Sequence, residues 1–238
     1  MPYVKEVCYA GDSVETRKYF SSRYKSEKWD RQKSKKPTTE EMERVNEQNA
    51  ERKLMRLLRC NFKRNDWYLT FTYRKGERPE TVEKAKDNLK KLKRKLRALY
   101  KKNKTELKYI FVTEYENKAI HHHAVVNYLD MREIQKVWPY GTIKPKLLYT
   151  EDGYFKKLAE YLIKETKRTF KKKETVSRKR WESSRNLEKP KIVKKIISAN
   201  SWREKVREKK GYKIIDQYNG FHEFTGCPYQ EYTMVRRE

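Results

Sequence analysis

The chain has 238 residues, of which 39% are charged, and its formal net charge is +28. Aromatic residues reach 13%, with 18 tyrosines and 5 tryptophans, which is more than a disordered basic tail carries. The composition therefore predicts a small folded core, in one domain with additions or in two small domains, under a positive surface that favours nucleic acid as partner.

Several classes of protein are excluded by what the sequence lacks. Three scattered cysteines do not form a disulfide framework and fit a reducing cytoplasm. The absence of a CxxC pair argues against a zinc finger, and the absence of GxxxxGK[ST] argues against a P-loop motor. We expect no signal peptide and no membrane partner, because no apolar run approaches the length of a membrane span.

The first half of the chain predicts an arm, a helix, a strand and a second helix. Residues 1–37 are polar, basic and aperiodic, whereas residues 38–62 predict a helix capped by Thr38 or Thr39, with an acidic first turn and a basic end. Residues 66–74, "DWYLTFTYR", predict a strand whose alternate side chains share one face: Leu69, Phe71 and Tyr73. Residues 81–102 repeat apolar residues at helical spacing, and their Lys/Arg face fits either solvent or phosphate contact.

The second half predicts a hairpin followed by alternating helices and strands. Residues 107–116 and 119–129 are expected to pair across the turn at 117–118. A short helix over 131–138, a strand over 141–149 and a helix over 151–168 follow, the last with an apolar stripe through Phe155, Leu158 and Leu162. A short basic helix around Trp202 and a strand near residues 211–224 are expected towards the C-terminus.

This order predicts an α+β fold, with a mainly antiparallel central sheet, helices covering one face and basic N- and C-terminal extensions. The other face of the sheet would be open to a ligand. The predicted segments are 1–60, a basic N-terminal arm and helix, then 61–190, the main domain, and 191–238, a C-terminal extension of a helix and a strand.

Three of the four histidines stand together in "IHHHAVV". On a strand, alternate residues share a face, so His121 and His123 point together while His122 points away. Glu114, on the neighbouring strand, can face them across the hairpin, and Glu116 has the same parity and is the reserve candidate. Two imidazoles and a carboxylate suit a divalent ion such as Mg²⁺ or Mn²⁺, although a purely structural pair of histidines fits the pattern equally well.

Two tyrosines precede lysines at the same spacing in the helix over 151–168. Tyr154 stands three residues before Lys157, and Tyr161 three residues before Lys164, so each pair lies on one helix face. A phenolate can attack a phosphodiester while the ammonium holds the phosphate. The motif is weak by itself, because tyrosine and lysine are both abundant in this chain.

Taken in order, "FTY", H-x-H and YxxK resemble the HUH endonucleases, the replication initiators and relaxases of rolling-circle elements. The resemblance covers about residues 66–189 and is closest to the replication initiators of bacterial phages, plasmids and integrated elements. His122 departs from the hydrophobic residue usual between the two histidines. The resemblance implies a ferredoxin-like or RRM-like palm.

By the same resemblance, His121 and His123 bind the divalent ion, Glu114 is its third ligand and Lys164 positions the phosphate. Tyr161 would attack a single DNA strand at an origin or hairpin, leaving a 5′-phosphotyrosine link and a free 3′-OH. Tyr154 is a possible second nucleophile, since some members alternate two tyrosines. Phe71 and Tyr73 would support the site or the DNA; we expect Phe71 to be core and include Tyr73 among the DNA-binding candidates.

A basic segment after the helix predicted over 151–168 adds further candidates for DNA binding. Cations interleaved with an aromatic residue fit single-strand binding through phosphate contacts and base stacking: Arg178, Arg180, Trp181 and Arg185. An ordinary exposed loop with Trp181 on the core is the alternative.

The resemblance also implies a cytoplasmic location in a bacterial host and a separate helicase supplied by that host. The lysine at 164 favours an initiator over the small transposases, which usually carry glutamine there. A conjugative relaxase of the same chemistry is the nearest alternative. A non-catalytic basic nucleic-acid-binding protein explains the charge, but not the ordered motifs; a member that binds origins without cutting would explain both.

Overall fold

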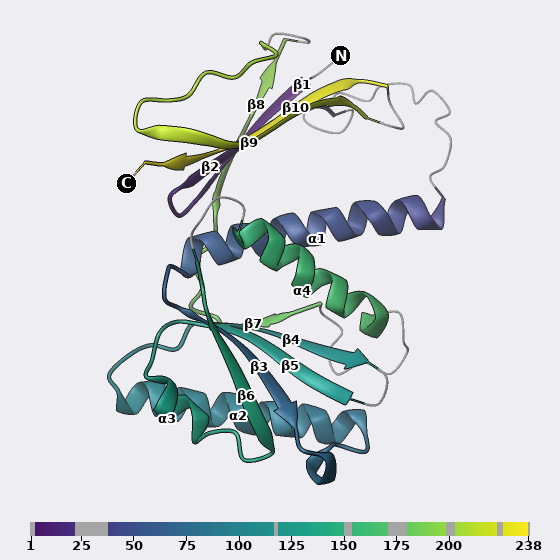
Figure 1. The fold of residues 1–238 in the computed structure, drawn as a ribbon. Coiled ribbons are helices and arrows are strands. Elements are labelled where there is room, and N and C mark those ends of the chain that lie inside the picture. Colours follow the sequence, from purple (N-terminus) through teal and green to yellow (C-terminus); the bar gives the residue numbers. More distant parts are fainter. Residues whose placement is uncertain are drawn as a thin grey trace. The chain divides into compact units, whose positions relative to one another are not determined.

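The computed structural model describes residues 3–21, 38–116, 119–149, 154–170, 180–198, 203–222 and 226–237. They fall into two compact units, one bounded by Met1–Cys60 and Lys189–Glu238, the other by Asn61–Glu188. Each unit contains a five-stranded sheet in which every pair of neighbouring strands is antiparallel (Figure 1). The predicted α+β class with an antiparallel sheet is confirmed.

The sheet of the Asn61–Glu188 unit has the strand order β6-β3-β5-β4-β7. Its strands are β3 (Trp67–Tyr73), β4 (Tyr109–Glu116), β5 (Ala119–Val126), β6 (Gly141–Leu147) and β7 (Glu182–Ser183). The predicted hairpin is present, since β4 and β5 pair directly, and its turn at 117–118 lies outside the described residues.

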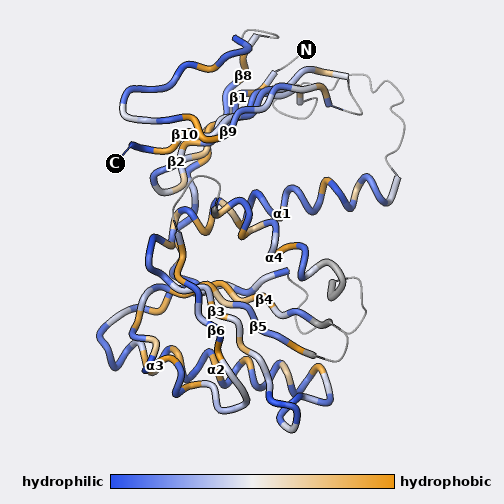
Figure 2. Tube along the Cα trace, in the orientation of Figure 1, coloured by the Kyte–Doolittle hydropathy of each residue, from blue (hydrophilic) through white to orange (hydrophobic). Residues whose placement is uncertain are grey.

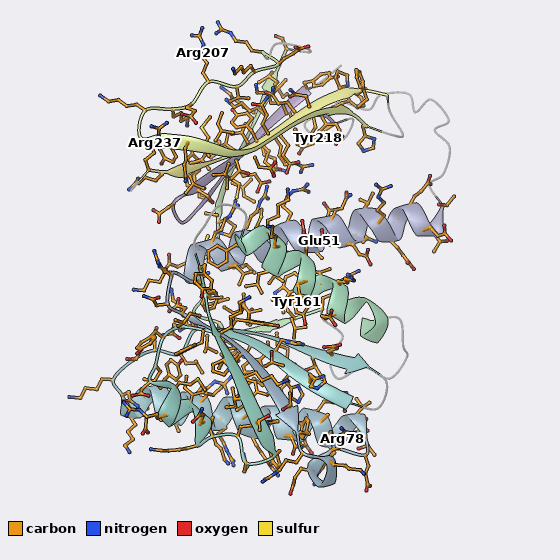
Figure 3. All side chains as sticks on the ribbon, viewed as in Figure 1. Glu51, Arg78, Tyr161, Arg207, Tyr218 and Arg237 are labelled. Carbon is orange, nitrogen blue, oxygen red and sulfur yellow. The ribbon has the colours of Figure 1, made fainter. Side chains whose placement is uncertain are left out.

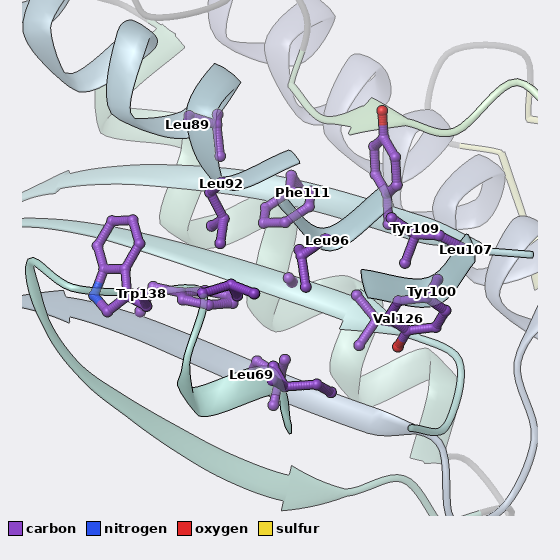
Figure 4. Close-up of a cluster of buried hydrophobic side chains, with 14 of the residues drawn as sticks. Leu69, Leu89, Leu92, Leu96, Tyr100, Leu107, Tyr109, Phe111, Val126 and Trp138 are labelled. Carbon is purple, nitrogen blue, oxygen red and sulfur yellow. The ribbon is translucent and has the colours of Figure 1, made fainter. Parts of the chain in front are cut away.

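One face of this sheet packs on α2 (Val82–Lys102) and α3 (Met131–Gln135), and a 3-10 turn, η1 (Lys75–Glu77), precedes α2. Thr81 caps α2 by accepting a hydrogen bond from the Lys84 amide. The leucines spaced along α2 bury against Leu69, Phe71 and Phe111 of the strands (Figure 4). Phe71 is fully buried, so its expected place in the core is confirmed.

The opposite face carries α4 (Tyr154–Phe170), which packs on β4 (Figure 1). The predicted apolar stripe of Phe155, Leu158 and Leu162 is buried. Helices therefore cover both faces, whereas we expected them on one. The reason is that Ile110, Val112 and Val125, on this second face, are as apolar and as buried as the residues under α2.

The other unit has the strand order β8-β1-β2-β10-β9, and its described residues contain one helix, α1 (Thr39–Asn61). Its strands are β1 (Tyr3–Ala10), β2 (Ser13–Phe20), β8 (Lys191–Ile197), β9 (Tyr212–Phe221) and β10 (Pro228–Arg236). The segments predicted as separate terminal extensions thus share one sheet, and residues 3–20, predicted as an aperiodic arm, form a hairpin. Gly11 makes the tight turn with φ of 56°, and a Cβ there would lie 2.2 Å from the Arg59 carbonyl oxygen.

The predicted helix α1 begins with a capping box. The Glu41 amide donates to Thr38 Oγ1, and the Thr38 amide donates to Glu41 Oε2. Near its other end, Arg56 donates to the carboxylates of Glu6 and Glu15. Trp202 lies outside the described residues, and the described residues 203–211 contain no helix.

Hydrophilic residues dominate the trace of both units, and hydrophobic residues form short stretches (Figure 2). Among the helices that the structure describes, none combines the length and the apolar character that a membrane span requires.

Candidate functional site

The histidine strand β5 divides its side chains between two environments, as strand alternation predicts. His123 faces α4, where its ring lies edge-on to the ring of Tyr161 with centroids 5.8 Å apart. His122 faces the opposite way and packs on Trp138, beside α3. His121 has the parity of His123 and lies opposite Glu114 in the β4–β5 register.

His122 belongs to the core. It is fully buried, and its two ring nitrogens are bonded to the hydroxyls of Tyr73 and Thr113, each at 2.9 Å. Burial, and then the neighbouring His123 and His121, lower the pKa of His122 to about 3, so the ring is neutral. The middle histidine of the run is thus a structural residue that bonds two buried hydroxyls.

This packing also changes the interpretation of Tyr73. Its side chain is 8% exposed and lies among Trp138, Tyr140 and His122. A buried side chain with a satisfied hydroxyl offers little surface to DNA, in contrast to the role expected from the sequence. Tyr73 supports the strand that carries the site.

His123 is held by partners on both neighbouring strands. Its Nε2 atom lies 3.0 Å from Oε2 of Glu114, and its Nδ1 atom lies 2.7 Å from the hydroxyl of Tyr68. Burial first, and then nearby His121, lower the pKa of His123 to about 4, against the opposing effect of the Glu165 carboxylate. The imidazole is neutral at pH 7, which is the form that binds a metal.

The pair of His123 and Glu114 has the spacing of two neighbouring metal ligands. Two ligand atoms at right angles, each about 2.1 Å from an octahedral ion, lie about 3.0 Å apart, as Nε2 and Oε2 do. Within the described part of the chain, no three His, Cys, Asp or Glu side chains already converge as a metal site. The donor set of two imidazoles and a carboxylate fits a divalent ion in kind, and the strand register places His121 opposite Glu114. The Glu116 side chain lies outside the described residues.

Tyr161 lies on α4, on the same side of the sheet as His123 (Figure 3). Its ring is edge-on to the rings of both His123 and Tyr68, and the side chain is 43% exposed. A tyrosine that touches the histidine while staying accessible is suitably placed to receive a substrate. Lys164 is exposed one turn further along α4, and Tyr154 begins the helix with its side chain outside the described residues.

Sequence reasoning missed two residues of this cluster, Tyr68 and Glu165. Burial raises the pKa of Tyr68, and Tyr161 and Glu165 raise it further, so its hydroxyl stays protonated. Tyr68 shares strand parity with Thr70, which lies opposite His123. The parity was visible in the sequence, but the β3–β5 register was not.

The basic candidates after α4 stand at or beside β7. Arg180 and Trp181 are half-buried and directly precede β7, which pairs with the edge of β4, and Arg185 is exposed. Arg178 lies outside the described residues. Their contact with DNA stays a prediction.

Residues 66–170 match the model of a family described as replication-associated protein ORF2/G2P. The matched range, less than half of the chain, runs from β3 to the end of α4 and contains His121, His123, Glu114 and Tyr161. Comparison with curated proteins and with solved structures gave no match. The family match supports a replication-initiator type of protein, with DNA as its partner.

Proposed function

We propose that this protein is a rolling-circle replication initiator of the HUH type, which nicks and rejoins single-stranded DNA at an origin. The observation that carries the proposal is the contact of an accessible tyrosine, Tyr161, with a neutral histidine, His123, whose Nε2 lies 3.0 Å from Glu114. A nucleophile beside a set of metal-ligand side chains is the arrangement that phosphodiester transfer requires.

In the proposed step, the Tyr161 oxygen attacks the phosphorus of the scissile bond. A Tyr161 O–P bond forms, the bond from phosphorus to the 3′ oxygen breaks, and the phenolic proton passes to solvent. The leaving 3′ oxygen takes up a proton and becomes the free 3′-OH, and the 5′-phosphate stays on the tyrosine. Because the phosphodiester energy is kept in the new bond, the reverse attack by a 3′-OH rejoins the strand.

Charge on the phosphate oxygens has to be stabilised while this exchange proceeds. A bound Mg²⁺ or Mn²⁺ would polarise those oxygens and ease departure of the 3′ oxygen. His123 and Glu114 would hold it, with His121 as the third ligand. Lys164, exposed on the same helix as Tyr161, would hold a phosphate of the bound strand.

Tyr68 has a positioning role in this proposal. Its hydroxyl can donate to Nδ1 of His123 or accept from it. When Nδ1 carries the proton, the hydroxyl accepts that hydrogen bond, and Nε2 is free to bind metal. It also lies against the ring of Tyr161 and thus orients both groups from one strand.

The biological setting follows from the same proposal. Origin or hairpin DNA in the cytoplasm of a bacterial host would be the substrate, and a host helicase would separate the strands. The sequence itself contains no P-loop motif.

The experiment mixes the protein with single-stranded DNA spanning its own genetic element, with Mn²⁺ or with chelator, and resolves products on a denaturing gel. We expect a metal-dependent adduct in the wild type and none in Tyr161→Phe, with DNA binding retained. Tyr154→Phe is the matched control and should keep the adduct. An absence of adduct over the whole element, with binding intact, would favour a DNA-binding protein without nicking activity.

A further inference from the structure

The terminal sheet carries an unbroken polar row on the face away from α1. Direct cross-strand partners link one residue on each of the five strands β8, β1, β2, β10 and β9, in that order: Lys195, Lys5, Lys18, Gln230 and Asn219. Three lysines thus occupy directly paired positions on the neighbouring strands β8, β1 and β2. We call Lys195, Lys5 and Lys18 the lysine row.

Such a row is unfavourable for folding. Side chains directly opposite in an antiparallel pair lie about 5 Å apart, and like charges there repel. Burial lowers the pKa of Lys5, and the charges of Lys195 and Lys209 lower it further. Burial also lowers the pKa of Lys18, with Lys5 as the second cause. The protein therefore keeps an arrangement that costs stability.

Acidic side chains of the same strands do not offset this charge, because strand alternation points them to the other face. Glu6, next to Lys5, binds Arg56 of α1 and Lys194, and Glu15 also binds Arg56. Among the residues that the structure describes, neither Lys5 nor Lys195 forms an ion pair. Lys18 donates to Gln230 Oε1 and lies over the Tyr232 ring, which fixes one end of the row.

We propose that the lysine row is a second DNA-binding site, which contacts the phosphate backbone of a DNA strand. A line of cations across three strands, spaced about 4.8 Å apart, spans about 10 Å. In a DNA double helix, each strand presents a phosphate about every 3.4 Å along the helix axis. A line of cations matches this linear array of anions better than it matches a single small anion. The site lies outside the residues 66–170 of the family match.

The inference needs DNA as partner but not the nicking chemistry, so the test uses full-length Tyr161→Phe protein. Binding of a labelled, mixed-sequence single-stranded oligonucleotide is measured by anisotropy over a range of salt concentrations, and Tm is measured in parallel. The test variant is Lys5→Gln/Lys195→Gln. The matched control is Lys194→Gln/Lys53→Gln, which removes the same charge from the opposite face of β8 and from the exposed Lys53 of α1.

The test variant should bind on the order of tenfold more weakly, with a salt slope smaller by about 1.4, since each single-strand phosphate contact contributes about 0.7. Its Tm should rise, because the repulsion is gone. The control should lose under about twofold in affinity, with no rise in Tm. Equal losses in both variants, or an unchanged slope in the test variant, would overturn the proposal. Lys195→Gln alone, at an exposed position of an edge strand, repeats the comparison if the double variant does not fold.

Discussion

Nε2 of His123 lies 3.0 Å from Oε2 of Glu114, although the strand register places Glu114 opposite His121. The Glu114 carboxylate therefore contacts the histidine that lies diagonally across the β4–β5 pair from it. His121 is the residue directly opposite Glu114 in the register. This relation puts one carboxylate within reach of both histidines on the face that α4 covers. It is the geometric basis for our proposal that all three side chains bind one ion.

The first prediction concerns that carboxylate. Glu114→Gln keeps the shape and removes the charge, so the Mn²⁺ concentration needed for half-maximal adduct formation should rise by about tenfold or more. A titration of adduct yield against Mn²⁺ measures it. Glu83→Gln, in the first turn of α2, is the control and should match the wild type. An unchanged titration in Glu114→Gln would remove Glu114 from the ligand set.

The second prediction concerns Tyr68. Tyr68→Phe keeps the ring against Tyr161 and removes the hydroxyl that bonds Nδ1 of His123. Loss of such an orienting bond typically costs about 10- to 100-fold in metal affinity or activity. We expect adduct formation to slow by that factor at limiting Mn²⁺ and to recover partly at high Mn²⁺.

The control for Tyr68 is Tyr128→Phe, at a tyrosine that is 56% exposed. It should leave the rate and its metal dependence unchanged. If Tyr68→Phe slows the reaction equally at all Mn²⁺ concentrations, the hydroxyl acts on something other than the metal ligands.

The third prediction separates the two kinds of histidine. His122→Ala opens a buried cavity and leaves the Tyr73 and Thr113 hydroxyls without their partner, so it should destabilise the protein by about 3 kcal/mol. His121→Ala should change the free energy of unfolding little and abolish metal-dependent nicking. Urea unfolding and the adduct assay, run on both variants, measure this difference. The reverse pattern would mean that the strand faces are assigned the wrong way round.

The fourth prediction concerns acid stability of the terminal sheet. Burial raises the pKa of Glu6, but hydrogen bonds and ion pairs with Lys194 and Arg56 outweigh it and hold the pKa at about 2. A depressed carboxyl pKa stabilises the fold above its unfolded value of about 4.3 and loses this effect as the pH falls towards 2. Glu6→Gln should therefore be less stable than the wild type at pH 7.

That stability difference should shrink as the pH falls from about 4.5 to 2. Thermal unfolding of both proteins, followed by circular dichroism over this range, measures it. Glu40→Gln, at an exposed position of α1, gives the background pH dependence. A difference that stays constant down to pH 2 would contradict the assigned ion pairs.

Local periodicity was enough to predict part of the candidate site. The two-residue repeat of a strand forces His121 and His123 onto one face. On the helix, the apolar stripe that includes Phe155 and Leu162, seven residues apart, places Tyr161 beside the buried side of α4. These relations depend on neighbours in sequence. They hold whatever the remaining topology is.

Relations between distant strands could not be predicted in this way. Tyr68 bonds His123 because β3 lies next to β5 with Thr70 opposite His123, and no local pattern encodes that register. Likewise, β1 and β2 pair with β8 and β10, which follow far along the chain. Charged and apolar residues are mixed in β1 and β2, as is typical of strands in a sheet with contacts on both faces. Without knowledge of the partner strands, this pattern resembles that of an irregular arm.

The central claim is that Tyr161 is the nucleophile, and the most direct test is to locate the attached nucleotide. Trypsin separates the candidates, because Tyr161 falls in the peptide "LAEYLIK" and Tyr154 in "LLYTEDGYFK". The adduct formed with Mn²⁺ is digested with nuclease and trypsin and sequenced by mass spectrometry. We expect a nucleotide on Tyr161 in "LAEYLIK" and none with chelator. A nucleotide on Tyr154, or on any other residue, would contradict it.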